Sequence, residues 1–334
     1  MKKNMQKEGG LMQCLVTGAA GFIGSHLAER LLADGHSVLG VDAFLDYYPR
    51  HIKERNLEGP RAWTSFTFVE GNLLEVNLPS ILEGVDWIFH LAAQAGVRSS
   101  WGQVFSLYVD CNLLATQRLL EATQHIDSLR RFVYASSSSV YGNVKELPVD
   151  ETAIPAPFSP YGVTKLAGEH LCTLYHHNYG VPTISLRYFS VYGPRQRPDM
   201  AFHRFCKAVI DHEPIRMYGD GYQTRDYTYV SDVVEATVSS AMASGAVGEI
   251  MNIAGGSRTT LHDAVQILRD VTGSSISIAF EEKQHGDVSD TFADTSRAQQ
   301  VIGYHPRVTL TDGLANEFEY MLSLYATHHR APFK

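Results

Sequence analysis

The sequence predicts an α/β fold in which a doubly wound parallel sheet is followed by a smaller, mixed α/β domain. Short β-rich segments alternate with helical patterns over about the first 190 residues, as in sheets whose parallel strands are joined by helical crossovers. A glycine-rich turn links the first of these strands to the first helix. Beyond about residue 190 the alternation gives way to loops, short strands and separate helices.

The strands and helices are predicted in order along the chain. The β-rich segments of the first half are QCLVT (13–17), SVLGVD (37–42), FTFVEG (66–71), DWIFHLA (86–92), RFVYASS (131–137) and TISLRY (183–188). After the first of them, FIGSHLAERLLAD (22–34) has apolar residues at helical spacing, and Gly35 follows in the position of a C-cap. Later, IRMYG (215–219) and EIMNIAG (249–255) predict strands, and a helix is expected to begin near Thr260.

The change of pattern predicts two domains. We expect residues 12–188 to form the doubly wound domain, with a later stretch, about 225–255, returning to it. Residues 189–320 are expected to form mainly the second domain. Because ligands of doubly wound sheets bind beyond the carboxyl ends of the strands, the second domain is expected to close over that edge and bind the substrate. Residues 1–11 are predicted to be a disordered tail.

Composition favours a cytoplasmic enzyme that acts on small molecules. The chain of 334 residues is 44% hydrophobic and has a net charge of −8, which argues against nucleic-acid and anionic-membrane partners. Its 4 cysteines form no CxxC pair, so no zinc site, other metal site or disulfide framework is predicted. No apolar run approaches the ~20 residues that span a bilayer, and MKKNMQKEGGLMQ lacks the apolar core of a signal peptide.

The glycine-rich turn predicts a dinucleotide site. LVTGAAGFIG places Gly18, Gly21 and Gly24 between the first strand and the first helix, where backbone amides and the helix dipole favour a pyrophosphate. Asp42 ends the second strand, in position to bond both ribose hydroxyls and to repel the 2′-phosphate of NADP. NAD is therefore the expected cofactor, and the alternative is that Asp42 only begins a loop.

A tyrosine and a lysine one helical turn apart predict the catalytic base. Tyr161 and Lys165 open the helical run YGVTKLAGEHLCTLYHH, so that both lie on one helix face. A nearby ammonium group is expected to lower the phenol pKa below its usual value. Tyr141 and Lys145 match the same pattern, but they occupy a turn after a strand.

Taken together, the ordered motifs resemble those of the extended short-chain dehydrogenase/reductase family, specifically its NAD-dependent nucleotide-sugar epimerases. The resemblance extends from about residue 12 to about 320, and UDP-glucuronate 4-epimerases are the most similar group. The segments that carry it are TGAAGFIG (17–24), HLAAQAGVR (90–98), SSSSVYG (136–142), YGVTK (161–165), RYFSVYGPRQRPDMA (187–201), GDGYQTRDYTYVSD (219–232) and HGDV (285–288).

The resemblance implies a Rossmann-type domain with tightly bound NAD and a UDP-sugar whose 4-hydroxyl faces the nicotinamide. It implies that Tyr161 is the base, that Lys165 binds the nicotinamide ribose, and that Ser137 and Ser138 lie at the sugar 4-oxygen. The residues expected to line the cofactor are Gly18, Ala20, Gly21, Phe22, Ile23, Gly24, Asp42, Asn72, Leu73, Leu91, Ala92, Ala93, Gln94, Asn112, Ser136, Tyr161, Lys165 and Tyr188.

Substrate residues are likewise implied by the family's motifs. Arg225 is expected to grip the diphosphate, and Phe202, Phe205 and PIRMYG (214–219) are candidates to sandwich uracil. Gln284 stands where many relatives have a second diphosphate-binding arginine. The full predicted set is Arg98, Ser137, Ser138, Ser139, Tyr161, Ser190, Arg197, Ala201, Phe202, Phe205, Met217, Arg225 and Asp287.

The serine run and one arginine narrow the reaction. Family members that dehydrate or decarboxylate a sugar carry an acid just before VYG, whereas this chain has Ser138 and Ser139. Neither serine can act as the acid or base of an elimination near neutral pH. Ser190 before VYGP and Arg197 in RPDMA are similar to UDP-glucuronate 4-epimerases, in which an arginine pairs with the sugar carboxylate.

The predicted reaction is therefore conversion of UDP-glucuronate to UDP-galacturonate through a 4-keto intermediate. A UDP-glucose or UDP-N-acetylglucosamine 4-epimerase stays open, as does a non-catalytic NAD-binding scaffold. Arg195 and Arg197 are alternatively loop residues or phosphate contacts. Helical runs at 104–126 and 161–178 are expected to pair across a homodimer as a four-helix bundle, as in relatives.

Overall fold

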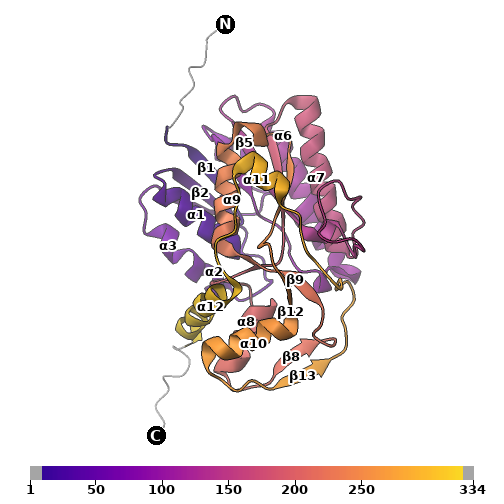
Figure 1. The fold of residues 1–334 in the computed structure, drawn as a ribbon. Coiled ribbons are helices and arrows are strands. Elements are labelled where there is room, and N and C mark those ends of the chain that lie inside the picture. The colour runs from indigo at the N-terminus through magenta and orange to yellow at the C-terminus, as the bar shows by residue number, and fades with distance from the viewer. Residues whose placement is uncertain (1–9, 326–334) are drawn as a thin grey trace.

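The computed structural model describes residues 10–325, and its centre is one parallel sheet (Figure 1). The sheet has seven strands in the order β11-β6-β5-β4-β1-β2-β3. They are β1 (Gln13–Thr17), β2 (Ser37–Asp42), β3 (Phe66–Glu70), β4 (Trp87–His90), β5 (Arg131–Ser137), β6 (Thr183–Tyr188) and β11 (Ile250–Ile253). This arrangement confirms the predicted fold class, and every predicted strand of the first half is present.

Helices cover both faces of the sheet because successive residues of its strands are apolar. Cys14 and Val16 of β1 pack in the core shared with α1 (Phe22–Ala33) and α9 (Val230–Met242). Leu15, between them, packs in a second core with α6 (Ala115–Thr123) and α7 (Pro160–Tyr179). Side chains of a strand alternate between its faces, so the sheet is doubly wound.

The strand order reverses next to β1, and this reversal locates the crevice in which doubly wound sheets bind their ligands. From β1 the chain adds β2 and β3 on one side, then returns to add β4, β5 and β6 on the other. The carboxyl ends of β1 and β4 therefore flank a topological switch point, where doubly wound proteins bind their ligands.

The elements after β6 lie mainly beneath the carboxyl edge of the sheet, in the lower part of Figure 1. Small sheets pair β8 (Ile215–Tyr218) with β13 (Ile278–Glu281), β9 (Thr224–Asp226) with β12 (Arg258–Thr260), and β7 (Val191–Tyr192) with β10 (Thr228–Tyr229). The helices of this region are α8 (Ala201–Ile210), α10 (Leu261–Thr272) and α12 (Leu310–Tyr325). By contrast, α9 and β11 belong to the layers of the large sheet.

The remaining elements are short. They are the α-helices α2 (Arg50–Asn56), α3 (Glu58–Arg61), α4 (Leu78–Leu82), α5 (Phe105–Tyr108) and α11 (Ser296–Ile302), the 3₁₀ turns Arg98–Ser100, Gly102–Val104, Ser138–Val140 and Ser244–Ala246, and a π-helical segment, Val109–Leu114. The predicted helix at 104–126 is thus α5, the π-helical segment and α6 in succession. The predicted helix at 22–34 ends one residue early, and Gly35 follows with a φ of +88°.

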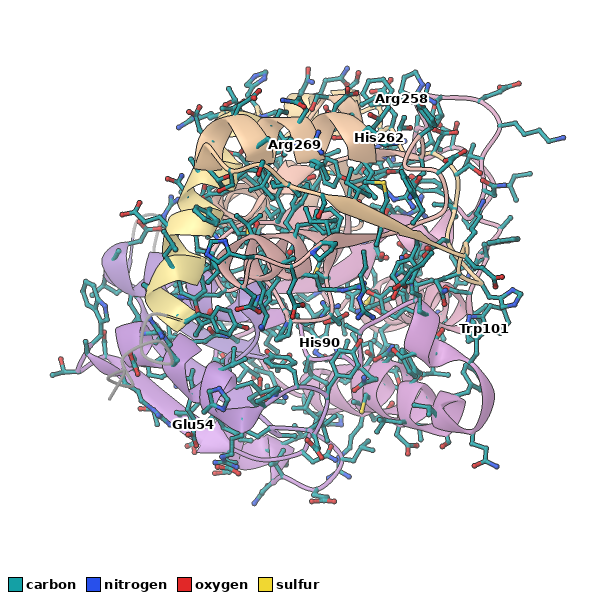
Figure 2. All side chains as sticks on the ribbon, turned by 90° about the horizontal axis from the view of Figure 1, so that it is seen from below. Glu54, His90, Trp101, Arg258, His262 and Arg269 are labelled. Carbon is teal, nitrogen blue, oxygen red and sulfur yellow. The ribbon has the colours of Figure 1, made fainter. Side chains whose placement is uncertain are left out.

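Packing is continuous between the sheet and the region beneath it. One core cluster joins Val16 of β1 and Val233 of α9 to Phe205 of α8, Met217 of β8 and Leu314 of α12. In Figure 2, His90 lies deep within the molecule, whereas Glu54, Trp101 and Arg258 lie toward its periphery. No helix within residues 10–325 is long and apolar enough to cross a membrane, and residues 1–9 of the predicted tail lie outside the described residues.

Candidate active site

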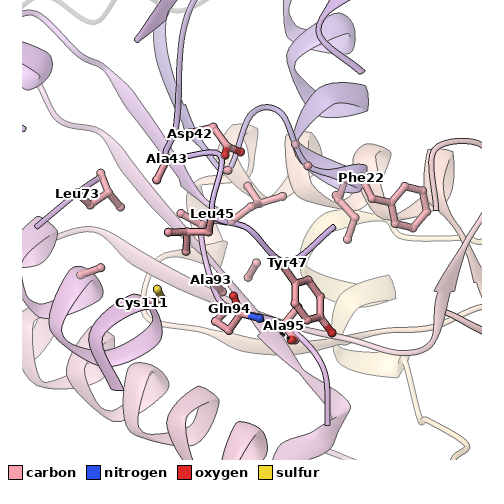
Figure 3. A pocket seen from close by; sticks show the side chains of 18 of the residues that line it. Phe22, Asp42, Ala43, Leu45, Tyr47, Leu73, Ala93, Gln94, Ala95 and Cys111 are labelled. Carbon is pink, nitrogen blue, oxygen red and sulfur yellow. Dashed lines mark hydrogen bonds between the residues drawn. The ribbon is translucent and has the colours of Figure 1, made fainter. Parts of the chain in front are cut away.

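The turn between β1 and α1 lies at the switch point and lines a cavity, the first cavity (Figure 3). Gly18 has a φ of +73°, and a Cβ atom there would lie 2.9 Å from the backbone nitrogen of Ala92. A Cβ atom on Gly24 would overlap the carbonyl oxygen of Gly18. The turn therefore packs tightly on both strand and helix. Amides in the first turn of a helix lack intrahelical partners and are suited to bind an anion.

The first cavity brings together most residues that were predicted to hold the cofactor. They are Gly18, Gly21, Phe22, Ile23, Gly24, Asp42, Asn72, Leu73, Leu91, Ala92, Ala93, Gln94, Ser136, Tyr161, Lys165 and Tyr188. Sequence reasoning missed Tyr47, Tyr48 and Lys53, which line the same cavity. No motif marks them, because they lie in and beyond the irregular loop that follows β2.

Two predicted cofactor residues do not line the first cavity. The side chain of Ala20 is buried against Phe44 and Leu57, although its amide contributes indirectly by bonding Asp42. Asn112 is buried, and its amide nitrogen donates to the Gln94 carbonyl at 3.0 Å and to Thr164 Oγ1 at 2.9 Å. Asn112 therefore joins the cavity wall to α7.

The Asp42 carboxylate is fixed at the rim of the first cavity. Its Oδ2 accepts from the amide of Ala20 at 3.1 Å, and its Oδ1 accepts from the amide of Phe44 at 2.9 Å. Burial raises its pKa, while these amides and the charge of Lys53 act in the opposite direction. A carboxylate held in this way would repel a ribose 2′-phosphate.

Tyr161 and Lys165 enter the first cavity from the start of α7. Ser159 caps this helix by accepting from the amide of Gly162 at 3.1 Å, and Pro160 occupies the first helical position. The ammonium group of Lys165 donates to the Ala135 carbonyl at 2.9 Å and lies 6.0 Å from the centre of the Tyr161 ring. The predicted pair is thus assembled at the carboxyl end of β5.

Burial governs the pKa values of this pair. It raises the pKa of Tyr161, against the charge of Arg197 and a hydrogen bond with Ser137. The sequence-based expectation that Lys165 lowers the phenol pKa is therefore wrong for the site as described. Burial also lowers the pKa of Lys165 to about 8, against the charges of Cys172 and Glu169.

The lowered pKa of Lys165 makes the ammonium form sensitive to mild alkali. Since the cationic form prevails only below about pH 8, we expect kcat to fall as pH rises through that value. The measurement is a pH profile of kcat for the wild type and for Lys165→Arg, whose guanidinium stays protonated. The alkaline limb should move to higher pH in the variant, and an unmoved limb would assign it to another group.

The four serines before Val140 lie at the end of β5 and in the turn that follows it, and their hydroxyls differ in environment. Ser136 donates to Glu169 in the interior, whereas Ser137 ends β5 and its Oγ lies 3.1 Å from Ser139 Oγ. Ser138 begins a 3₁₀ turn and, like Ser139, is partly exposed. Tyr141 and Lys145, which match the same spacing as Tyr161 and Lys165, do not form a site. The hydroxyl of buried Tyr141 instead donates to Asn252 at 2.7 Å.

A second cavity adjoins the first and is rich in arginine. Tyr47 and Arg197 line both cavities. The second cavity also contains the predicted residues Arg98, Ala201, Phe205 and Asp287, and the unpredicted residues Arg204, Arg216 and Tyr218. Its guanidinium groups, set against two aspartates, suit a ligand that carries several negative charges.

The aromatic wall of the second cavity is Tyr218. The guanidinium carbons of Arg98 and Arg204 lie 4.3 and 5.0 Å from the centre of its ring, and Arg98 also pairs with Asp287 at 2.7 Å. The i, i+3, i+4 spacing of Ala201, Arg204 and Phe205 on one face of α8 is the sequence signal by which Arg204 could have been found.

Other substrate residues lie elsewhere than predicted. Phe202 is 1% exposed and packs on Tyr227, and Met217 is fully buried, so neither can sandwich a base. Ser190 is partly exposed, and its backbone carbonyl accepts from Thr228.

The two predicted diphosphate positions also differ from expectation. Arg225 lines a neighbouring cavity, but its guanidinium donates to the carbonyls of Thr224, Val288 and Ser289. Gln284 is partly exposed, and its amide nitrogen donates to the Glu282 carbonyl at 3.1 Å. Within residues 10–325, no group of His, Cys, Asp or Glu side chains is arranged to hold a metal.

Comparison with known proteins gives consistent matches over nearly the whole chain. YtcB of Bacillus subtilis, named an uncharacterized UDP-glucose epimerase, is 49% identical over 94% of this chain and 99% of its own. A UDP-glucuronate 4-epimerase of Thermodesulfobacterium geofontis is 36% identical over 90% and 93%. The crystal structure of Bacillus cereus UDP-glucuronic acid 4-epimerase with UDP-glucuronic acid and NAD has a TM-score of 0.92 and 44% identity, over 94% of this chain and 100% of that one.

The glycine turn, the Tyr161–Lys165 pair and the arginine-lined second cavity define a Rossmann-type enzyme of the extended short-chain dehydrogenase/reductase class. The chain belongs to the GDP-mannose 4,6 dehydratase family, which matches residues 15–316.

Proposed function

We propose that the protein is an NAD-dependent 4-epimerase that converts UDP-glucuronate to UDP-galacturonate. The observation that carries this proposal is the position of Arg197, which lines both cavities and acts electrostatically on Tyr161. A guanidinium beside the catalytic base suits a sugar that bears a carboxylate near its reacting carbon.

The residues of the first cavity fit NAD. Gly24 leaves no room for a side chain at the turn, and the Asp42 carboxylate suits ribose hydroxyls better than a phosphate. NAD held there would supply the hydride acceptor for the oxidation of C4 and the hydride for its reduction.

The chain's own residues manage the proton and the orientation of the sugar. Tyr161 takes the proton of the 4-hydroxyl as C4 is oxidised, and it returns a proton to the 4-oxygen when C4 is reduced. Ser137, which hydrogen-bonds Tyr161, holds the same oxygen. Lys165, fixed by the Ala135 carbonyl, supplies positive charge behind Tyr161 and binds the nicotinamide ribose.

The serine turn limits the chemistry to epimerisation. Ser138 and Ser139 occupy the turn after β5 where an eliminating enzyme needs an acid or base, and a hydroxyl does not serve that purpose near neutral pH. Intact Ser137, Tyr161 and Lys165 argue against a non-catalytic NAD-binding scaffold.

A UDP-glucose 4-epimerase is the second candidate. It is favoured by the 49% identity to YtcB, which is named an uncharacterized UDP-glucose epimerase. Incubation with UDP-glucuronate, UDP-glucose and UDP-N-acetylglucosamine, followed by product analysis, tests both candidates.

Arg197→Ala separates the two candidates. If Arg197 holds the sugar carboxylate, its loss removes a charge-assisted hydrogen bond worth about 1.5–3 kcal/mol. KM for UDP-glucuronate should then rise, and more decarboxylated 4-keto-pentose should be released. UDP-glucose turnover should stay nearly unchanged. Equal loss of both substrates without pentose formation would instead place Arg197 on the diphosphate and favour the second candidate.

We also propose a cytoplasmic homodimer formed through a four-helix bundle. The free thiols of Cys14, Cys111, Cys172 and Cys206 agree with a reducing compartment. Apolar side chains are exposed along the helices that would pair, namely Val104, Phe105 and Leu114, and Val163 and Leu174 of α7.

The dimer is tested by charge on its proposed face. Leu174→Glu should shift the mass measured by light scattering from that of a dimer to that of a monomer, since a carboxylate cannot be buried there unpaired. Leu322→Glu, at an exposed leucine of α12, is the matched control and should stay dimeric. A wild-type monomer would contradict the proposal.

A further inference from the structure

The two residues before Arg197, Arg195 and Gln196, are held by contacts outside the two cavities. Arg195 has a φ of +67°, and its guanidinium donates to Glu29 at 2.8 Å and to Ser25 at 3.2 Å, both on α1. Gln196 is buried and bonded to the Val191 carbonyl at 3.1 Å. These contacts anchor the backbone just before Arg197, and the Arg197 side chain lines the two cavities.

Asp199 holds one side of the Arg197 guanidinium. Nε and Nη2 each donate to a different carboxylate oxygen of Asp199, both at 3.0 Å. Tyr47, from the loop after β2, donates to the same carboxylate at 3.1 Å. Nη1 of Arg197 makes no hydrogen bond to another side chain or carbonyl within residues 10–325.

This clamp is continuous with the wall of the catalytic base. Tyr47 lies 3.4 Å from Ser99, whose hydroxyl lies 2.7 Å from that of Tyr108. The Tyr108 ring meets the ring of Tyr161 edge to face, with centres 6.3 Å apart. Three hydroxyl contacts and one ring contact therefore connect the carboxylate of Asp199, which holds Arg197, to the ring of Tyr161.

We propose that Asp199, held by Tyr47, is a positioning residue that fixes Arg197 so that Nη1 meets the substrate carboxylate and restrains it during the 4-keto stage. This inference rests on the proposed function. A bidentate pair fixes a guanidinium in two directions, so the third nitrogen has a defined place. A substrate without a carboxylate has no use for that restraint.

The chemical consequence is retention of carbon dioxide. In the 4-keto intermediate the carboxylate is β to a ketone. If the C5–C6 bond turns perpendicular to the carbonyl plane, that bond breaks and C6 leaves as CO2. The electron pair then forms an enolate across C4 and C5, which is protonated at C5. An arginine of fixed orientation opposes this rotation, whereas a loose one allows it.

The test is the ratio of 4-keto-pentose to UDP-galacturonate formed from UDP-glucuronate by the holoenzyme. Asp199→Asn keeps the size of the side chain but cannot accept from both guanidinium nitrogens, and we expect the ratio to rise about tenfold, the equivalent of one lost charged hydrogen bond. Tyr47→Phe should raise it less. Asp199→Glu, which keeps the carboxylate, should restore most of the wild-type ratio.

Controls separate positioning from folding. Asp211→Asn removes an aspartate paired with Lys207 near the far end of α8 and should leave the ratio unchanged. A folding defect lowers both products together and therefore leaves their ratio unchanged. Turnover of UDP-glucose, which has no carboxylate, should not depend on the orientation of Arg197. An unchanged ratio in both Asp199→Asn and Tyr47→Phe overturns this inference but leaves the proposed function in place. A wild-type enzyme that converts UDP-glucose but not UDP-glucuronate overturns the proposed function as well.

Discussion

Tyr161→Phe is expected to lower kcat about 10²–10⁴-fold, because it removes the hydroxyl that exchanges a proton with the sugar 4-oxygen. Burial raises the pKa of Tyr161, while the charge of Arg197 and a hydrogen bond with Ser137 favour the phenolate, the form that accepts the sugar proton. The ring itself packs edge to face on Tyr108, and phenylalanine preserves that contact. Folding and NAD content should therefore be unchanged.

Product analysis by anion-exchange chromatography measures this loss, and the absorbance of released cofactor measures NAD content. Tyr179→Phe is the matched control, since Tyr179 ends the same helix and is 60% exposed. Its activity should equal that of the wild type. If Tyr161→Phe kept near-normal activity, the base would have to be another residue. Tyr141 could not replace it, because its hydroxyl is bonded to Asn252 and Arg187.

The sheet could be predicted from sequence because its signals are local. Each strand is a short apolar segment, and the order of strands and helices in a doubly wound fold follows from their alternation. The glycine turn could be predicted as well, because Gly18 and Gly24 have no space for a side chain and glycine is therefore required at these positions. Tyr161 and Lys165 share a helix face through spacing alone.

Substrate contacts were harder to predict because they depend on tertiary packing. Phe202 and Phe205 differ by three positions on α8, yet only Phe205 lines the second cavity, while Phe202 packs on Tyr227. Periodicity cannot tell which of two neighbouring apolar residues faces a cavity. Tyr47 and Asp199 are 152 positions apart, so no local pattern joins them.

The pKa of Tyr161 shows the same limit. The spacing of Tyr161 and Lys165 places a cation near the phenol, but burial, which has the opposite effect on its pKa, is a property of the folded site. Arg197 acts on the phenol from the loop between β7 and α8, far from Tyr161 in the sequence. A sequence motif identifies the partners of a reaction, whereas their protonation depends on what surrounds them.

A buried ion pair holds the catalytic helix on the sheet. Glu169 of α7 accepts from Nε and Nη2 of Arg187 on β6, at 2.9 and 2.8 Å. Arg187 also donates to the Tyr141 hydroxyl at 2.8 Å, and Ser136 donates to Glu169. The side chains of Glu169 and Arg187 are only 1% and 4% exposed. One pair thus joins α7, β5 and β6 behind Tyr161 and Lys165.

Glu169→Gln is expected to lower the free energy of unfolding by about 3–5 kcal/mol, because it leaves the buried guanidinium of Arg187 without a counter-charge. Urea denaturation and a melting curve measure the loss. Glu54→Gln removes a carboxylate from the exposed pair with Arg50 and should cost at most about 1 kcal/mol. Equal losses in the two variants would show that the buried pair contributes no more than a surface one.

Glu169 also raises the pKa of Lys165, so the alkaline limb of kcat should move to lower pH in Glu169→Gln. A purely structural role would lower stability without moving that limb, and the pH profile therefore shows whether the pair acts on the catalytic lysine.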